Sequence, residues 1–188
     1  TCINRGCIPT KALLASASLL NSIKKGSEFG IKSGEFSVDF SIMNKRKERI
    51  VRQFVNGIAQ LFKSYGIVLM KGRAKLTERI KDGMIEIEVE KDDGSVEKVI
   101  AKKLIIATGS IPAQIPGISI DEREVITSDQ ALELEEVPSS LLIVGGGVIG
   151  VEFASIFSSL GSKVTIVELL ERIIPTEDEE ISEELKKF

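Results

Sequence analysis

Histidine and tryptophan are absent from this chain of 188 residues, and cysteine occurs only twice. Without histidine, two cysteines cannot complete the four-ligand site that zinc usually occupies, so we predict no metal centre. The same scarcity excludes a secreted scaffold built on several disulfides. A catalytic histidine, if the chemistry requires one, would have to come from outside these residues.

Long apolar runs and a surplus of one charge are also missing. No run approaches the roughly 20 apolar residues that span a bilayer. The formal net charge is −3, with acidic and basic residues interspersed, which gives no basic surface for nucleic acid. We therefore predict neither a membrane span nor nucleic-acid binding, and we expect a cytoplasmic protein.

The two cysteines, Cys2 and Cys7, open the chain in the run T-C-I-N-R-G-C-I-P-T-K. At this spacing they can close a small disulfide ring that opens by thiol exchange; two inert buried thiols are the alternative. A helix is predicted over residues 8–25, and its end can stabilise a thiolate and lower its pKa. Lys11, about one turn beyond Cys7, would place a cation near that thiolate or a bound cofactor, unless it is an ordinary surface lysine.

The middle of the chain changes from helical to strand patterns. A second helix is predicted over residues 41–65, with apolar residues at helical spacing and Gly66 at its end. Strands are predicted over residues 67–70, 85–90, 96–101 and 103–108, the second and third forming a hairpin. Thr127 and the two residues after it can cap a short helix that ends near residue 136.

The C-terminal part has the pattern of a βαβ unit. After Pro138 we predict a strand over residues 141–144, a glycine loop over 145–150, a helix over 151–160 and a strand over 163–168. Gly161 is the expected C-cap of that helix. Parallel strands joined in this way imply an α/β fold. We place a domain boundary at Pro138, so that the domains cover residues 1–137 and 138–188.

The glycine loop, G145-G-G147-V-I-G150, matches the dinucleotide-binding pattern G-x-G-x-x-G between a strand and a helix. Gly145 permits the tight turn, Gly147 lets a pyrophosphate approach the backbone, and Gly150 lets helix and strand pack closely. Glu168, at the end of the next strand, suits the ribose hydroxyls of NAD and would repel the 2′-phosphate of NADP. A glycine turn that binds nothing is the alternative. The predicted NAD-binding residues are Gly145, Gly146, Gly147, Val148, Ile149, Gly150, Val151, Glu152 and Glu168.

Three motifs in order resemble the flavin-dependent disulfide oxidoreductases: the cysteine run extended to T-K-A-L-L, A-T-G-S at 107–110, and G-G-G-V-I-G-V-E-F-A-S at 145–155. Within them the chain is most similar to the dihydrolipoamide dehydrogenases. Mercuric, glutathione and trypanothione reductases share the cysteine spacing. NADP-dependent glutathione reductases tend to have Ala at the third glycine and Arg near the second strand end, so Gly150 and Glu168 favour the lipoamide type. Arg5 stands where many relatives have Val.

The resemblance implies a Rossmann-like α/β flavoprotein with two dinucleotide-binding domains. Both domains would be incomplete here: a partial FAD domain over residues 1–137, containing the disulfide and an antiparallel β-meander, and a partial NAD domain over residues 138–188. A chain that begins within a motif, without methionine, is expected to be an internal piece of a longer protein. Alone it should expose apolar faces and be a poor enzyme.

The resemblance also implies roles for individual residues. Cys2 would attack the substrate disulfide, Cys7 would lie next to the flavin, and Lys11 would lie beside the flavin and pair with Glu152. The alternative for Glu152 is an acid that merely favours a helix N-terminus. The expected FAD-binding residues are Thr1, Cys2, Lys11, Gly72, Thr108, Gly109 and Ser110, although the last three could be a plain strand-ending turn.

The implied activity is a relay in which dihydrolipoamide reduces the Cys2–Cys7 disulfide and electrons pass through FAD to NAD. The substrate would be carried on lipoyl domains of 2-oxo acid dehydrogenase or glycine cleavage complexes. The protein would be a homodimer, with a base histidine from the partner's C-terminal domain. Two alternatives stay open: a mercuric or glutathione-type reductase, and a nucleotide-binding redox module that has no turnover.

Overall fold

The computed structural model describes residues 1–79 and 83–187, which form two compact units with a sheet in each. The first unit comprises Thr1–Val55 and Pro112–Phe188, and the second comprises Asn56–Ile111. The boundary that the sequence places at Pro138 falls inside the first unit. The division into an FAD and an NAD domain stays a prediction.

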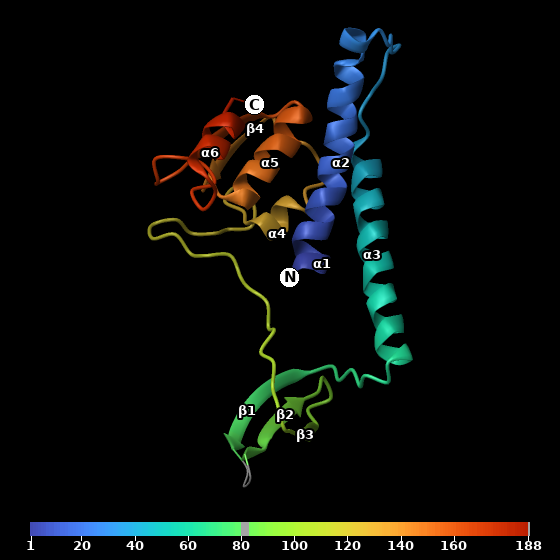
Figure 1. The fold of residues 1–188 in the computed structure, drawn as a ribbon, viewed down its shortest axis with the longest axis vertical. Helices are drawn as coiled ribbons and strands as arrows, with labels where there is room; N and C mark the ends of the chain where they lie inside the picture. The colour runs from blue at the N-terminus through green and yellow to red at the C-terminus, as the bar shows by residue number, and fades with distance from the viewer. Residues whose placement is uncertain (80–82, 188) are drawn as a thin grey trace. The chain divides into compact units, whose positions relative to one another are not determined.

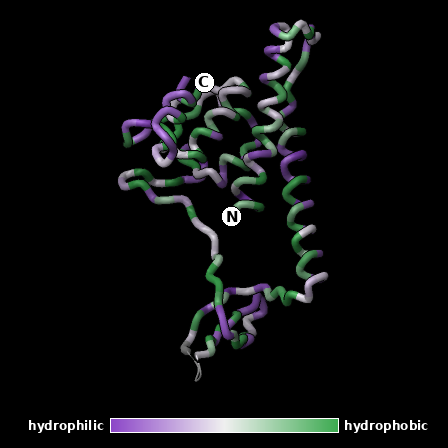
Figure 2. Tube along the Cα trace, viewed as in Figure 1, coloured by the Kyte–Doolittle hydropathy of each residue, from purple (hydrophilic) through white to green (hydrophobic). Residues whose placement is uncertain are grey.

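The elements of the first unit are mostly helical (Figure 1). In chain order they are α1 (Cys2–Arg5), α2 (Cys7–Lys24), a 3₁₀ turn (Gly26–Phe29), the first part of α3 (Phe40–Ser64), α4 (Ser128–Ala131), β4 (Ser140–Val144), α5 (Val148–Ser159), β5 (Lys163–Val167) and α6 (Glu179–Leu185). The helices predicted over residues 8–25 and 41–65 are therefore confirmed to within one residue at each end. Figure 2 shows the segment around α6 as mainly hydrophilic.

The βαβ unit is confirmed. Strands β4 and β5 are parallel and in register from Ser140 opposite Lys163 to Val144 opposite Val167, with α5 as the crossover. Helix α5 begins at Val148, three residues earlier than predicted, because the last part of the glycine motif is already helical. The C-cap is Leu160, one residue before the expected Gly161. Gly161 follows it with φ of +103°, and the N–H of Ser162 donates to the carbonyl of Phe157 at 3.0 Å, which closes the helix end.

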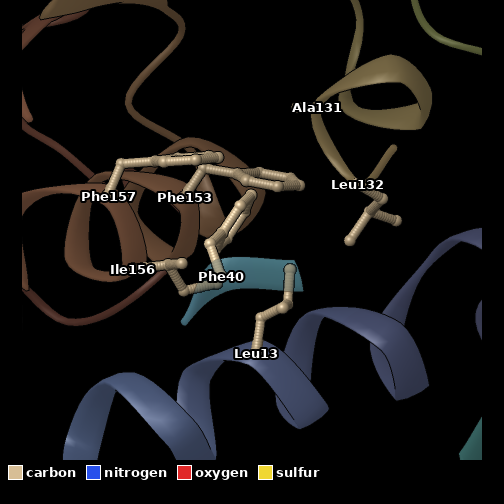
Figure 3. Packing of buried hydrophobic residues seen from close by; sticks show 7 residues of the cluster. All are labelled: Leu13, Phe40, Ala131, Leu132, Phe153, Ile156 and Phe157. Atoms are coloured by element: carbon tan, nitrogen blue, oxygen red, sulfur yellow. The ribbon is translucent and has the colours of Figure 1, made fainter. Parts of the chain in front are cut away.

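A single apolar core joins α2, α3, α4 and α5 (Figure 3). Its buried members are Leu13, Phe40, Ala131, Leu132, Phe153, Ile156 and Phe157. The rings of Phe153 and Phe157 stack with their centroids 6.1 Å apart, one turn apart on α5. This core fixes the redox-motif helix α2 against the nucleotide-motif helix α5.

Helices α2 and α5 run parallel, as contacts at both ends show (Figure 1). Near the start of each helix, Lys11 pairs with Glu152. At the far ends, Asn21 donates to the Ser159 hydroxyl and Lys24 donates to the Ser159 carbonyl, both at 2.8 Å. The cysteines and the glycine loop therefore lie at the same end of the helix pair.

Helix α4 is shorter than predicted. Thr127 caps it through a capping box with Gln130, as expected, but it ends at Ala131 rather than near residue 136. Side chains from α3 compete for the carbonyls that follow. Lys47, which is buried, donates to the Leu132 carbonyl, and Asn44 donates to the Leu134 carbonyl at 2.9 Å. These bonds satisfy carbonyls that a longer helix would have used, and burial lowers the pKa of Lys47.

The second unit contains the antiparallel meander that the sequence predicts, in the order β1 (Arg73–Arg79), β2 (Ile85–Glu90), β3 (Val96–Ala101). The hairpin of β2 and β3 is confirmed at the predicted bounds, whereas β1 was not predicted. The strands predicted over residues 67–70 and 103–108 are wrong: both segments are irregular, and Val68 and Ile105 are more than 80% exposed. A strand requires a hydrogen-bonding neighbour, and neither segment pairs with another strand in the part of the chain described.

Apolar side chains also remain exposed in the first unit. Leu142 and Val144 of β4 and Val167 of β5 lie on a strand face that is about half exposed or more. This confirms the expectation that these residues alone leave apolar faces uncovered. Among residues 1–79 and 83–187, no helix combines the length and the hydrophobicity that crossing a membrane requires.

Candidate active site

The two cysteines lie where helices α1 and α2 meet. Cys2 is the first residue of α1, Cys7 is the first residue of α2, and Gly6 separates the two helices. A Cβ atom at Gly6 would lie only 3.0 Å from the Cα of Cys2, so this glycine allows the ring between the cysteines to turn tightly. Both cysteines are exposed free thiols in the structure, which represents the dithiol form.

The pKa of Cys7 is raised from its ordinary value, mainly because its thiol hydrogen-bonds to Cys2; partial loss of solvent around the thiol adds to the rise, and the charge of Lys11 opposes it. The expected lowering of the pKa at the helix end is therefore wrong for the dithiol form. The neighbouring thiol favours the protonated state of Cys7 more strongly than Lys11 favours the thiolate. The same hydrogen bond places the two sulfurs within reach of each other.

Lys11 and Glu152 form the ion pair that the resemblance implies. The pair joins the second turn of α2 to the early part of α5, and the Glu152 side chain is only 20% exposed. The hydrogen bond that Lys11 donates to Glu152 raises the pKa of Lys11. Lys11 thus stays a cation between the dithiol and the glycine-loop helix, and the alternative of an unattached surface lysine is excluded.

The glycine loop has the geometry that its motif predicts. Gly145 turns with φ at +111°, which favours glycine. A Cβ atom at Gly150 would collide with the carbonyl oxygen of Gly145 and lie 3.2 Å from the Ile143 side chain. Gly147 is the N-cap of α5, and no side chain caps the helix there. No heavy atom lies within 4 Å of the Cβ position of Gly147, so space is open beside the N–H groups of the first turn.

Glu168 folds back onto this loop. Its carboxylate accepts the N–H of Gly146 at 2.5 Å and the N–H of Leu170 at 2.9 Å. These backbone bonds, that of Leu170 first, lower the pKa of Glu168 and keep it ionised. Each carboxylate oxygen retains a lone pair that could accept a ribose hydroxyl.

Arg172, the cation closest to this carboxylate in sequence, serves its own loop. It donates to the carbonyls of Pro175 at 3.3 Å and Glu177 at 3.2 Å. A 2′-phosphate beside Glu168 would therefore have to compete with these carbonyls for Arg172. The uncapped helix start and the anchored carboxylate fit the pyrophosphate and ribose of NAD.

The residues predicted for FAD are divided between the two units. Thr1, Cys2 and Lys11 belong to the first, and Gly72 and residues 108–110 belong to the second. Gly72 has φ of +152°, and a Cβ atom there would collide with the Glu90 carbonyl, so the sheet itself requires glycine. Gly109 has φ of +81° in an irregular segment. The FAD roles of these residues stay predictions.

Sequence reasoning missed a contact that holds the loop from the other side. The N–H of Ile174 donates to the Gly146 carbonyl at 2.7 Å, and a Cβ atom at Gly146 would lie 3.0 Å from the Ile173 side chain. The feature of the sequence that could have indicated this contact is the pair of isoleucines, which stands among acidic and polar residues. Their spacing carries no information about the backbone conformation that brings them to the loop.

Comparison with known families gives a match over the whole chain. The family described as pyridine nucleotide-disulphide oxidoreductase matches residues 1–188. The resemblance inferred from three motifs therefore extends over the segments between them.

Curated relatives match nearly the whole chain. The chain is 45% identical over 186 residues to a protein named dihydrolipoyl dehydrogenase from Chlorobaculum tepidum, covering 99% of the chain and 39% of the relative. It is 46% identical over 185 residues to one of the same name from Bacillus subtilis, covering 97% and 39%. The chain thus spans about 40% of the length of the curated relatives it matches.

Solved structures share the fold. The crystal structure of LpdA from Mycobacterium tuberculosis covers 99% of the chain and 40% of that protein, with a TM-score of 0.88 and 24% identity. The HOCl-induced flavoprotein disulfide reductase RclA from Escherichia coli, a mutant solved as a Cu(II) complex, covers 100% and 38%, with a TM-score of 0.76 and 29% identity. The α/β fold of a flavin disulfide oxidoreductase is confirmed.

Proposed function

Because the chain belongs to the pyridine nucleotide-disulphide oxidoreductase family, we propose that it is part of a dihydrolipoyl dehydrogenase that oxidises dihydrolipoamide and reduces NAD. The ion pair between Lys11 and Glu152 carries the proposal, since it joins the dithiol helix to the dinucleotide-loop helix near their starts. The names of the relatives that are 45% and 46% identical support the choice of substrate.

Cys2 and Cys7 perform the sulfur chemistry. A thiolate of dihydrolipoamide attacks the Cys2 sulfur of the oxidised pair, forming a mixed disulfide and releasing Cys7 as a thiolate. The second substrate thiolate then attacks the substrate sulfur of the mixed disulfide and releases Cys2. Lipoamide leaves oxidised, and the protein keeps two electrons as the dithiol. Lys11 stabilises the Cys7 thiolate by its charge, in agreement with its lowering effect on the pKa of Cys7.

When bound, FAD and NAD would supply the hydride chemistry, while the protein supplies binding and orientation. Residues Gly145–Val151 would hold the NAD pyrophosphate, Glu168 the ribose, and Glu152 would lie towards the nicotinamide. The candidate FAD residues are Thr1, Cys2, Lys11, Gly72, Thr108, Gly109 and Ser110. We further propose a cytoplasmic homodimer whose substrate is carried on lipoyl domains of 2-oxo acid dehydrogenase or glycine cleavage complexes.

The test is an assay of NADH formation from dihydrolipoamide by the full-length protein that contains this chain. We expect turnover in the wild type and its loss in both Cys2→Ser and Cys7→Ser. Ser18→Ala is a control for the loss of one exposed hydroxyl on the same helix. Turnover that persists in either cysteine variant would refute the proposed role of the dithiol.

The two alternatives are separated by other substrates and by the visible spectrum of the same protein. A mercuric or glutathione-type reductase would reduce Hg(II) or glutathione disulfide and leave dihydrolipoamide unused. A redox module without turnover would be colourless and show no long-wavelength charge-transfer band when partly reduced. Either result would replace the proposed substrate, and the second would also remove the flavin from the proposal.

A further inference from the structure

Ile174 has an unusual backbone for its residue type. Its φ is +41°, in the left-handed region that β-branched residues rarely adopt, and its side chain is buried. Such a conformation persists only where the surrounding contacts enforce it. Among the described residues, the only other non-glycine residue with positive φ is the exposed Glu122.

The strained residue is bonded to the glycine loop. The N–H of Ile174 donates to the carbonyl of Gly146 at 2.7 Å, while the N–H of Gly146 donates to Glu168 at 2.5 Å. Both polar groups of Gly146 are therefore fixed. In a trans peptide the N–H of Gly147 points opposite to the carbonyl of Gly146, so the Ile174 bond also sets the direction of the Gly147 N–H. Gly147 is the N-cap residue of α5, and no side chain caps the helix there.

A buried hydroxyl on α6 holds the strained segment in place. Ser182 is 1% exposed, and its hydroxyl lies 2.9 Å from the Ile173 carbonyl and 3.4 Å from the Ile174 carbonyl. The shorter of these is the stronger hydrogen bond. A continuous path of contacts thus runs from Ser182 through the Ile173–Ile174 segment to Gly146.

We propose that Ser182 and Ile174 are positioning residues that hold the peptide between Gly146 and Gly147 in the orientation that binds the dinucleotide. The inference rests on the proposed function, because it assigns these residues to the NAD site. Neither residue needs to contact the dinucleotide. Their effect is preorganisation: a loop already in its binding geometry loses less conformational freedom when the ligand binds.

A purely structural role for Ser182 is the competing explanation, and the chain offers a matched control. Ser162 is also buried, at 7% exposure, and its hydroxyl donates to the Pro138 carbonyl at 2.6 Å. It precedes β5, whereas the glycine loop follows the parallel strand β4, so the two lie roughly 20 Å apart along the strands. Ser162→Ala therefore removes a similar bond far from the loop.

The experiment measures the NADH dissociation constant and the thermal unfolding midpoint of the full-length holoenzyme as wild type, Ser182→Ala and Ser162→Ala. We expect both variants to lower the midpoint by a few degrees. Only Ser182→Ala should weaken NADH binding, by up to about tenfold, because the free energy of one hydrogen bond is the most that its loss can subtract from binding. Reduction of the bound flavin by dihydrolipoamide, measured anaerobically without NAD, should be the same in all three proteins.

The outcomes separate this inference from the proposed function. Equal NADH affinity in Ser182→Ala and Ser162→Ala would overturn the inference and leave the function standing. A wild type that binds no NADH would instead refute the proposed function. If Ser182→Ala fails to fold, Ile174→Gly decides, because glycine keeps the N–H and accepts the same φ but lacks the buried side chain that anchors the segment, and it leaves the backbone freer to move. Wild-type affinity in that variant would overturn the inference, and a several-fold loss would support it.

Discussion

The starts of the parallel helices α2 and α5 carry two loops that are held in opposite ways. At the start of α2 the dithiol ring is exposed, and its one side-chain ion pair, Arg5 with Asp129, lies at the surface. At the start of α5, Gly146 of the glycine loop is fixed through its N–H by Glu168 and through its carbonyl by Ile174. The glycine loop is therefore bonded to a neighbouring segment on each side, whereas the ion pair of the ring is open to solvent.

This difference corresponds to what each loop is proposed to do. Thiol exchange requires access to a sulfur and a change of bonding partner, so few contacts should restrain the ring. Binding a dinucleotide through backbone N–H groups requires a preset geometry, so many contacts should restrain the loop. The Lys11–Glu152 pair connects the two ends across the helix interface.

Removing the shared core should break both loops at once. Phe157 is fully buried in this core and stacks on Phe153. We expect Phe157→Ala to lower the free energy of unfolding by about 3–5 kcal/mol, because it leaves a cavity in the core. Urea unfolding measures the effect. Phe29→Ala, at a side chain that is 78% exposed, is the control and should change it little. Similar losses in both variants would show that burial of Phe157 in the core does not determine the stability of the unit that carries both loops.

Two alanine substitutions in the glycine loop should distinguish the glycine that is needed for packing from the glycine that is needed for binding. Gly150→Ala forces a Cβ atom onto the Gly145 carbonyl, so we expect a loss of about 1–3 kcal/mol in unfolding free energy together with loss of NADH binding. The Cβ atom of Gly147→Ala would point into open space, so the unfolding free energy should fall by less than about 0.5 kcal/mol. NADH binding should still weaken. Urea unfolding and NADH titration test the pair. A Gly150→Ala protein as stable as Gly147→Ala would contradict the close packing.

Replacing Lys11 should affect the ring and leave the loop unchanged. Lys11 lowers the pKa of Cys7, so Lys11→Met should raise it further. A thiol reacts as its thiolate, so the pH profile of Cys7 alkylation should move to higher pH and the rate at neutral pH should fall. Stability should fall by less than about 1 kcal/mol, because the pair is exposed at Lys11.

Alkylation with iodoacetamide, followed by mass spectrometry of the Cys7 peptide, measures this profile. Lys25→Met, which removes a lysine at the opposite end of α2, is the control and should leave the profile unchanged. Rates of wild type and Lys11→Met should converge at a pH above both pKa values. An unchanged profile would mean that Lys11 does not act on the thiolate.

The sequence predicted best those features that depend on nearby residues. The alternation from Ile85 to Glu90 gave the hairpin its bounds, and the glycine motif gave the βαβ unit its position. The Lys11–Glu152 pair required the family resemblance, because the two residues are far apart in sequence. The strands predicted over residues 67–70 and 103–108 rested on apolar content alone, and they were wrong because a strand also needs a hydrogen-bonding partner.

The parts that could not be predicted depend on backbone conformation and tertiary contacts. Nothing in the run containing Ile173 and Ile174 signals a positive φ, because isoleucine disfavours it. Strand β1, R-A-K-L-T-E-R, was not predicted because its many charged residues weaken the apolar alternation that indicates a strand. The raised pKa of Cys7 arises from the geometry of two thiols, which spacing alone does not give.

The smallest effect should come from Arg5, the residue of the ring that forms the surface ion pair. Its guanidinium lies 3.2 Å from Asp129, but the Arg5 side chain is half exposed, so Arg5→Val should change the unfolding free energy by no more than about 0.5 kcal/mol. The groups that shift the pKa of Cys7 are Cys2 and Lys11, together with burial and the backbone, and Arg5 is not among them. Alkylation of Cys7 in Arg5→Val should therefore follow the wild-type pH profile, whereas Lys11→Met moves it. A larger shift in Arg5→Val than in Lys11→Met would mean that the ring depends on its surface ion pair, and that the two loops are restrained more alike than their contacts indicate.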